Sequence, residues 1–358
     1  MTRVMSEQPP PRPARNFGSA IKFQIPQLQS QQDSHSAHPY CMQLTHPYLV
    51  SGSADKSIRM WEVQSQRLVQ GPLQGHEGSV LCLQVNRVDD AIVSGSTDGS
   101  FIVWRFSTGD IFKRVSKAHE DSILSLSLDS EYLITGGKDG KVKVWNHRNA
   151  TYDLMATVFG TTPSPINALK YHGNSKTIIS GSGGGMLTTW CLEGGNPTLL
   201  RETNMQGSGI ACLGIACLDV DQSGRFIVTG HSYNGSIRFY GMHENRQIGE
   251  ISGIHRGVVR SVVILSCNSN GPQRIASAGY DGSVRFFSHI GNERWIEDGF
   301  LDYGMAKEPD SEVERAYAVS VPEGDRVFSI AVDEERGRVY CSGQRKEIVG
   351  WQLLPSTD

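Results

Sequence analysis

Three residues of this sequence, His76, Ser94 and Asp98, have the types of a nucleophilic trio in which a histidine takes the proton of a serine hydroxyl. The combination is not confined to one place, because His119 and Asp139 repeat it about 40 residues later. A catalytic site needs only one copy of its machinery. The recurrence therefore favours structural hydrogen bonding, and we predict no catalytic residue.

The sequence indicates no metal site or phosphate-binding loop. The seven cysteines include no CxxC pair, and no HxxxH pair accompanies the histidines, although zinc sites commonly use such spacings. The glycine-rich run from Ser180 to Gly185 lacks the GK[ST] ending of a phosphate loop and a following helix, so we interpret it as a turn. We expect no metal and no cofactor.

Composition limits the classes of partner and the location. Hydrophobic residues make up 38% and charged residues 20% of the 358 positions, which permits a folded core. The formal net charge of −3 does not supply the broad basic field that favours nucleic-acid or membrane binding. No signal peptide or membrane-length apolar run is evident, and an odd number of cysteines fits a disulfide framework poorly. We expect a cytoplasmic and/or nuclear protein with no nucleic-acid or membrane partner.

Aromatic residues return along the chain at a regular interval. The first four are separated by 43, 41 and 45 residues, a period typical of propeller blades. The series consists of Trp61, Trp104, Trp145, Trp190, Tyr240, Phe287 and Trp351. Six residues before each lies a predicted turn, which is aspartate in four cases, namely Asp55, Asp98, Asp139 and Asp281. Four histidines keep a register with small residues of the next strand: His35, His76, His119 and His255.

These registers predict a polar network inside each repeat. A histidine from the loop before a repeat can bridge the turn aspartate to a serine such as Ser94, and that serine can reach the indole N–H of Trp104. Loss of one member would leave its partners unsatisfied, at about 1–3 kcal/mol for each buried polar group.

The repeats resemble WD40 repeats, most clearly in residues 40–63, 75–106 and 118–147, and the similarity covers nearly the whole chain after about residue 20. The resemblance implies an all-β fold, a seven-bladed β-propeller. No repeat ends in the Trp-Asp pair of the family, and blades 4, 5 and 7 lack both the histidine and the aspartate.

The seventh repeat lacks an outer strand after Trp351, and we predict that Ser19 to Leu28 supplies it and closes the ring. The expected organisation is a disordered proline-rich tail over 1–18 and a propeller over 19–358. A PxxP ligand within Pro9 to Pro13 is the alternative for the tail.

The interval between Phe287 and Trp351 swells to 64 residues, which predicts an acidic insertion at about 290–314. Aromatic residues, including Trp295, are interleaved with its carboxylates. This segment either recruits a partner or packs its aromatic residues against its own propeller.

In such a propeller, the residue before the small residue of the first strand and the residue before the turn aspartate point toward the rim of one face. These registers predict five protein-binding residues: Tyr40, Lys138, Arg260, Tyr280 and Phe328. The same registers include Leu81, Leu124 and Asn167. The alternative is that rim residues simply pack at the tops of the blades.

Blades 1 to 3 also resemble the propeller of F-box/WD40 ubiquitin-ligase substrate receptors, which implies capture of a short, often phosphorylated degron and a complex with Skp1 and cullin. No F-box precedes the propeller in this sequence, and among the first-strand rim positions only Arg260 matches an arginine. The predicted function is a non-enzymatic scaffold that binds a peptide or protein. The alternatives are a cullin-ligase substrate receptor and, from another class, a propeller hydrolase.

Overall fold

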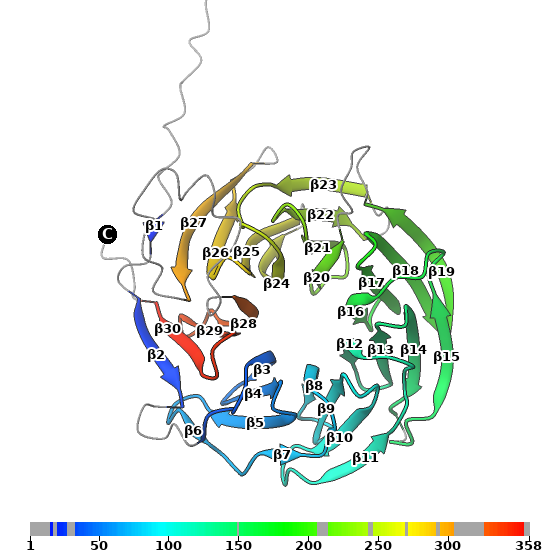
Figure 1. Cartoon of the computed structure of the whole chain (residues 1–358). Helices are drawn as coiled ribbons and strands as arrows, with labels where there is room; N and C mark the ends of the chain where they lie inside the picture. The colour runs from blue at the N-terminus through cyan, green and yellow to red at the C-terminus, as the bar shows by residue number, and fades with distance from the viewer. Residues whose placement is uncertain are drawn as a thin grey trace, which may run out of the picture.

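Seven small sheets form a closed ring (Figure 1), and residues of the innermost strand of each line a central channel. The computed structural model describes residues 15–16, 20–26, 33–148, 150–205, 214–242, 246–268, 271–290, 294–303 and 326–353. Each sheet is a blade whose strands a to d are counted from the channel outwards. The loop entering strand a and the turn between strands b and c contact each other on one face, here called the top face, as the bond from the Ala54 amide to the His38 carbonyl shows (2.9 Å). The turns between strands a and b lie on the bottom face.

The first four blades follow one another along the chain. Blade 1 contains β3 (Pro39–Thr45), β4 (Tyr48–Ser53) and β5 (Ser57–Glu62), with β6 (Arg67–Leu68) and β7 (Leu73–Gln74) both paired to β5. Blade 2 contains β8 (Val80–Asn86), β9 (Ala91–Ser96), β10 (Phe101–Arg105) and β11 (Ile111–Val115). Blade 3 contains β12 (Ile123–Leu128), β13 (Tyr132–Gly137), β14 (Lys141–Asn146) and β15 (Leu154–Phe159). Blade 4 contains β16 (Ile166–His172), β17 (Thr177–Ser182), β18 (Met186–Glu193) and β19 (Asn196–Asn204).

The last three blades complete the ring and include the N-terminal strands. Blade 5 contains β20 (Ile215–Val220), β21 (Phe226–His231), β22 (Ile237–Gly241) and β23 (Arg246–Ile251). Blade 6 contains β24 (Val259–Asn268), β25 (Gly271–Gly279), β26 (Ser283–His289) and β27 (Trp295–Asp302), with β1 (Arg15–Asn16) parallel to β27. Blade 7 contains β28 (Val327–Asp333), β29 (Arg338–Gly343), β30 (Ile348–Gln352) and β2 (Ile21–Ile25).

The predicted fold class is therefore confirmed, including ring closure by an N-terminal strand. β2 lies antiparallel to β30 along its whole length, from Ile21 opposite Gln352 to Ile25 opposite Ile348. It supplies the outer strand that the C-terminal repeat lacks. The predicted proline-rich tail lies largely outside the described residues.

The acidic insertion expected at about 290–314 needs a correction. Its first part, Trp295–Asp302, is β27, the ordinary outer strand of blade 6, and Trp295 stacks on Phe239 of blade 5 with ring centroids 4.4 Å apart. The extra length lies after Tyr303, because 24 residues separate Tyr303 from Val327, whereas four separate His119 from Ile123. Residues 304–325 lie outside the described part of the chain.

The hydrophobic core lies between neighbouring blades. One cluster joins Val50 and Ile58 of blade 1 to Ile92 and Trp104 of blade 2, and each of the other six joints has a corresponding cluster among the described residues. Strand b is buried on both faces, so it needs small residues where the next blade approaches. A Cβ atom added at Gly52 would lie 2.5 Å from Cγ1 of Val80, which requires glycine there.

Candidate functional site

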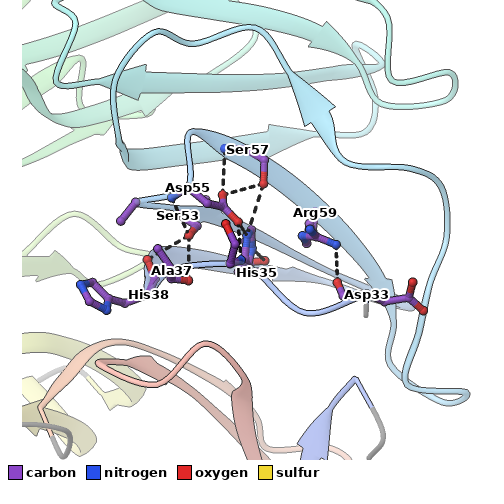
Figure 2. A network of polar contacts seen from close by, with 12 residues as sticks. Asp33, His35, Ala37, His38, Ser53, Asp55, Ser57 and Arg59 are labelled. Atoms are coloured by element: carbon purple, nitrogen blue, oxygen red, sulfur yellow. Dashed lines mark hydrogen bonds and ion pairs between the residues drawn. The ribbon is translucent and has the colours of Figure 1, made fainter. Parts of the chain in front are cut away.

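Four residues of blade 1, His35, Asp55, Ser51 and Trp61, form a hydrogen-bonded network that we call a tetrad. Figure 2 shows its surroundings. His35 Nδ1 lies 2.9 Å from Asp55 Oδ2, and its Nε2 lies 2.9 Å from Ser51 Oγ. Trp61 donates its indole N–H to the same serine oxygen at 2.9 Å. The network is consistent when Nδ1 donates to the carboxylate and the serine hydroxyl donates to Nε2. The Ser57 hydroxyl also donates to Asp55 Oδ1, at 2.6 Å.

Blades 2 and 3 contain the same network. In blade 2, His76 contacts Asp98 at 3.2 Å and Ser94 at 2.8 Å, and Trp104 donates to Ser94 at 2.9 Å. In blade 3, the corresponding contacts join His119 to Asp139 at 3.0 Å and to Thr135 at 2.8 Å, with Trp145 donating to Thr135 at 2.9 Å. The Ser/His/Asp trio noted in the sequence is thus one copy of a buried hydrogen-bond network that several blades share.

Blade 6 keeps three members of the tetrad. His255 contacts Asp281 at 3.0 Å and Ser277 at 2.8 Å, but Phe287 replaces the tryptophan and has no N–H to donate.

Blades 5 and 7 fill the same place with other side chains. In blade 5, His231 comes from strand b itself and lies fully buried, with Nε2 3.0 Å from Thr229 Oγ1. In blade 7, Tyr303 takes the histidine position. Its backbone amide donates to the Gly282 carbonyl, just as the amide of His119 donates to the Gly99 carbonyl. Arg345, at the turn position, lies 5.5 Å from the Tyr303 ring. A cation–π contact here replaces the histidine–aspartate pair.

Three predicted rim residues gather at one side of the channel mouth. The Phe328 ring lies 5.3 Å from the Tyr40 ring and 5.9 Å from the Tyr280 ring, measured between centroids. His38 contacts both Tyr40 and Phe328, and the Arg326 guanidinium lies 5.3 Å from the Tyr280 ring. We call these five residues, which come from blades 1, 6 and 7, the aromatic cluster.

The other two predicted rim residues lie differently. Arg260 lines the central channel in a cavity of about 190 Å³ to which all seven blades contribute, Tyr40 and Phe328 among them. Its Nη1 is 3.5 Å from the Ala216 carbonyl oxygen of blade 5. Lys138 is on the top turn of blade 3, where it pairs with Asp121 at 3.3 Å. The structure therefore places Arg260 in the channel, in contact with blade 5, and Lys138 on blade 3.

Comparison with known proteins agrees with this geometry. Residues 27–62, 67–105, 112–146 and 206–241 match the family described as WD domain, G-beta repeat. These segments correspond to blades 1, 2, 3 and 5. The chain is a seven-bladed β-propeller that contains WD40 repeats.

Relatives of this WD40 propeller share only part of their length with it. A bromodomain and WD repeat-containing protein of Dictyostelium discoideum is 27% identical over 49% of this chain. The periodic tryptophan protein 2 homolog of Caenorhabditis elegans is 23% identical over 47%, and protein MAK11 of Saccharomyces cerevisiae 25% identical over 41%. The matched segments cover 6%, 17% and 28% of these relatives, respectively.

Sequence reasoning missed three residues of the top face of the WD40 propeller. Tyr233 holds the same pre-turn position in blade 5 as Tyr280 in blade 6, and its side chain is 68% exposed. The register that found Tyr280 would have found it. Arg326 and His38 hold the same position in blades 7 and 1, two residues before Phe328 and Tyr40, and the carbonyl of each accepts from an amide of the b–c turn. The spacing that marks Phe328 and Tyr40 could therefore have marked them as well. Asn167, a predicted rim position, donates instead to the Ile215 carbonyl at 3.0 Å and joins two blades.

The channel of the WD40 propeller offers little nucleophilic chemistry. Burial raises the pKa of the Cys41 and Cys217 thiols to about 12, so both stay protonated at neutral pH. Among the described residues, no group of three His, Cys, Asp or Glu side chains could hold a metal ion. The same part of the chain contains no helix long and apolar enough to cross a membrane.

Acidification should destabilise the WD40 propeller through its tetrads. Burial lowers the pKa of His35 and His119, despite the opposing effect of Asp55 and Asp139. Below about pH 6.5 these histidines bind protons more readily in the unfolded chain than in the folded chain. Their contribution to the free energy of unfolding is therefore fully present above that pH and decreases below it. Burial alone would raise the pKa of Asp55, but hydrogen bonds from His35 and Ser57 outweigh burial and lower it. The ionised Asp55 therefore stabilises the folded chain at neutral pH, and this stabilisation is lost as the pH falls below about 4.

We expect the melting temperature to stay level between pH 8 and 7 and to fall by about 3–6 °C between pH 7 and 5. Circular dichroism melts at fixed ionic strength would measure the change. A His119→Gln variant should show a shallower slope over the same range, and a melting temperature that rises on acidification would contradict this account.

Proposed function

We propose that this WD40 propeller is a non-enzymatic interaction scaffold that holds a peptide or protein segment on its top face. The observation that carries the proposal is the aromatic cluster at the mouth of the channel, which Arg260 also lines. Aromatic and arginine side chains are the residues that most often dominate binding energy at interfaces. Rings from three blades, set at angles of 39° to 76° to one another, form a surface that can enclose a side chain of the partner.

Rigidity supports the same proposal. A tetrad holds the b–c turn of blade 1, the three-residue network of His255 holds that of blade 6, and the Tyr303–Arg345 contact holds that of blade 7. A surface that is fixed before the partner arrives loses little conformational entropy on binding. The tetrads therefore serve binding through the turns that they position.

The charge around the cluster favours an acidic segment in the partner. The top faces of blades 6, 7 and 1 carry six basic side chains, beside the carboxylates of Asp55, Asp281 and Glu347. The basic residues are Arg256, Arg260, Arg326, Arg345, Lys346 and Lys56. This charge is the specific observation behind a second candidate, a substrate receptor of a cullin-type ubiquitin ligase that captures a phosphorylated degron. Co-purification of Skp1 and cullin with the tagged chain would support that candidate, and their absence would reject it.

The combined substitution of Arg260→Ala and Tyr280→Ala should remove partner capture while the melting temperature changes by less than about 3 °C, because both side chains lie at the rim. The measurement is affinity purification of the tagged full chain from cell extract, with each co-purifying protein quantified for wild type and variant. Lys138→Ala is the matched control, since it removes a basic rim residue outside the cluster. Partners retained by the double variant would reject this surface.

A further inference from the structure

In the lower half of the channel, hydrogen bonds connect consecutive blades. At four joints, the side-chain oxygen of the fifth residue of strand a accepts a bond from the backbone N–H of the sixth residue in the next blade. The donor and acceptor pairs are Val85 to Gln43 (2.8 Å), Leu128 to Gln84 (2.6 Å), Tyr171 to Ser127 (2.9 Å) and Ile264 to Asp219 (3.0 Å). The amide of each inner strand is thereby satisfied by its neighbour.

Three joints depart from this rule because the fifth residue carries no acceptor oxygen. Lys170, Val263 and Ala331 occupy the position in blades 4, 6 and 7. The amides that face them belong to Val220, Val332 and Leu44, which are paired with strand b in the same register as Val85. These three N–H groups therefore point into the channel opposite side chains that cannot accept from them.

Cavities open at these joints on the bottom face. One of about 880 Å³ lies across blades 4 to 6 and is lined by Lys170, Val220 and Leu265. A second, of about 380 Å³, lies across blades 6, 7 and 1 and is lined by Leu265, Val332 and Leu44. Because Leu265 lines both, the two cavities share one wall. Their volumes fall within or near the range of ligand sites.

We propose that this bottom channel mouth binds an extended peptide segment of a partner protein. The peptide carbonyl oxygens accept from the amides of Val220, Val332 and Leu44, and its apolar side chains cover Leu265 and the half-buried valines. Only an elongated molecule reaches donors on three blades. The site lies at the opposite end of the channel from the aromatic cluster and does not depend on it, so the propeller can join two partners.

The charges around these cavities argue against a simple anion as the ligand. Lys170 is paired with Asp219 at 3.1 Å, and His172 Nε2 lies 3.1 Å from the Gln222 carbonyl oxygen that accepts from it. Arg225 of the first cavity donates to the Ser223 hydroxyl at 2.9 Å. In the second cavity, Arg336 pairs with Asp333 at 3.5 Å and with Glu335 at 3.7 Å, and Glu334 adds another carboxylate. Neutral amide donors above an apolar wall fit a polypeptide chain better than a phosphate or a lipid headgroup.

The test is selection of random twelve-residue peptides displayed on phage against the full chain, followed by affinity measurement of the selected synthetic peptides. Two variants address the site. Val263→Gln restores at one joint the acceptor that Gln43 and Gln84 provide, and Leu265→Lys places a charge on the shared wall. Either is expected to weaken binding at least about tenfold without a large change in the melt. Tyr40→Ala, at the other end of the channel, is the matched control and should leave binding unchanged.

Hydrogen exchange supplies a second readout that does not depend on the variants. A bound peptide should slow exchange in β20, β28 and β3, which contain the three donors. The proposal is overturned if no peptide is selected, if the selected peptides are lost with Tyr40→Ala instead, or if these strands gain no protection. Failure here leaves the top-face function untouched, because that function is read from partners lost with the Arg260 and Tyr280 substitutions.

Discussion

Deletion of residues 1–30 is expected to lower the melting temperature by more than about 10 °C, because it removes the strand that closes the ring. Ile25 of β2 is fully buried in the cluster that joins blade 7 to blade 1, together with Leu49, Trp61 and Tyr340. Without β2, the outer edge of β30 is exposed and this cluster loses one wall.

The contacts of β2 explain why so short a strand matters. The Phe23 ring lies edge-on to Tyr340 with centroids 5.9 Å apart, and it covers Gly350, where a Cβ atom would lie 2.3 Å from the ring. Lys22 donates to the Tyr303 carbonyl at 3.0 Å and lies 5.6 Å from the Trp351 ring centroid. β2 thus also holds the residue that replaces the tetrad histidine of blade 7.

Thermal melts of three purified proteins decide the matter. Deletion of residues 1–14 is the matched control, since it leaves β1 and β2 whole, and it should melt within about 2 °C of wild type. Ile25→Ala removes buried surface without cutting the chain and should cost about 2–4 kcal/mol. If the deletion of 1–30 melts like wild type, β2 does not close the propeller in solution.

The sequence predicts the regular parts of this molecule because their spacing is imposed by physics. Each blade repeats one hydrogen-bond problem, so the histidine, aspartate and tryptophan of blades 1 to 3 return at similar intervals and are visible without any structure. Strand b contains a glycine where the next blade approaches, for the same packing reason. A Cβ at Gly181 would lie 2.4 Å from Ile215 of the next blade, so the constraint repeats around the ring.

The irregular parts were not predictable because another residue solves the same problem from a different place in the chain. His231 reaches Thr229 from strand b, two residues away, and therefore lies outside the histidine register. Tyr303 stands 24 residues before Val327, so nothing in the spacing connects it with blade 7. Likewise, β27 was taken for part of an insertion because an outer strand, half exposed to solvent, accepts charged residues freely.

The candidate binding residues show where register ends and packing begins. A register places Tyr40, Lys138, Tyr280 and Phe328 on the top face, but it does not say which of them meet. Three converge because blades 6, 7 and 1 are neighbours in the closed ring, a relation that joins the two ends of the sequence. Lys138 belongs to blade 3 and finds Asp121 instead.

Asp139→Ala should produce a large loss of stability, about 3–5 kcal/mol. Asp139 accepts from three groups: His119 Nδ1 at 3.0 Å, the Glu120 amide at 3.2 Å and the Lys141 amide at 3.1 Å. Its side chain is only 5% exposed, so water replaces these bonds poorly. Truncation leaves several buried donors without an acceptor and frees the histidine that holds Thr135 and, through it, Trp145.

Urea denaturation of the full chain would measure this loss of stability. Two further variants distinguish the loss of charge from the loss of hydrogen bonds and control for the removal of an aspartate. Asp139→Asn keeps one acceptor oxygen and should lose about half as much, because it removes charge rather than all bonding. Asp121→Ala is the matched control: it removes an exposed aspartate of the same blade, paired with Lys138, and should leave the midpoint unchanged. Equal midpoints for Asp139→Ala and Asp121→Ala would mean that the tetrads do not pin the blades. In that case the rigidity attributed to the top face would have to come from the clusters between blades, where Trp145 packs against Phe101 of blade 2 with ring centroids 5.1 Å apart.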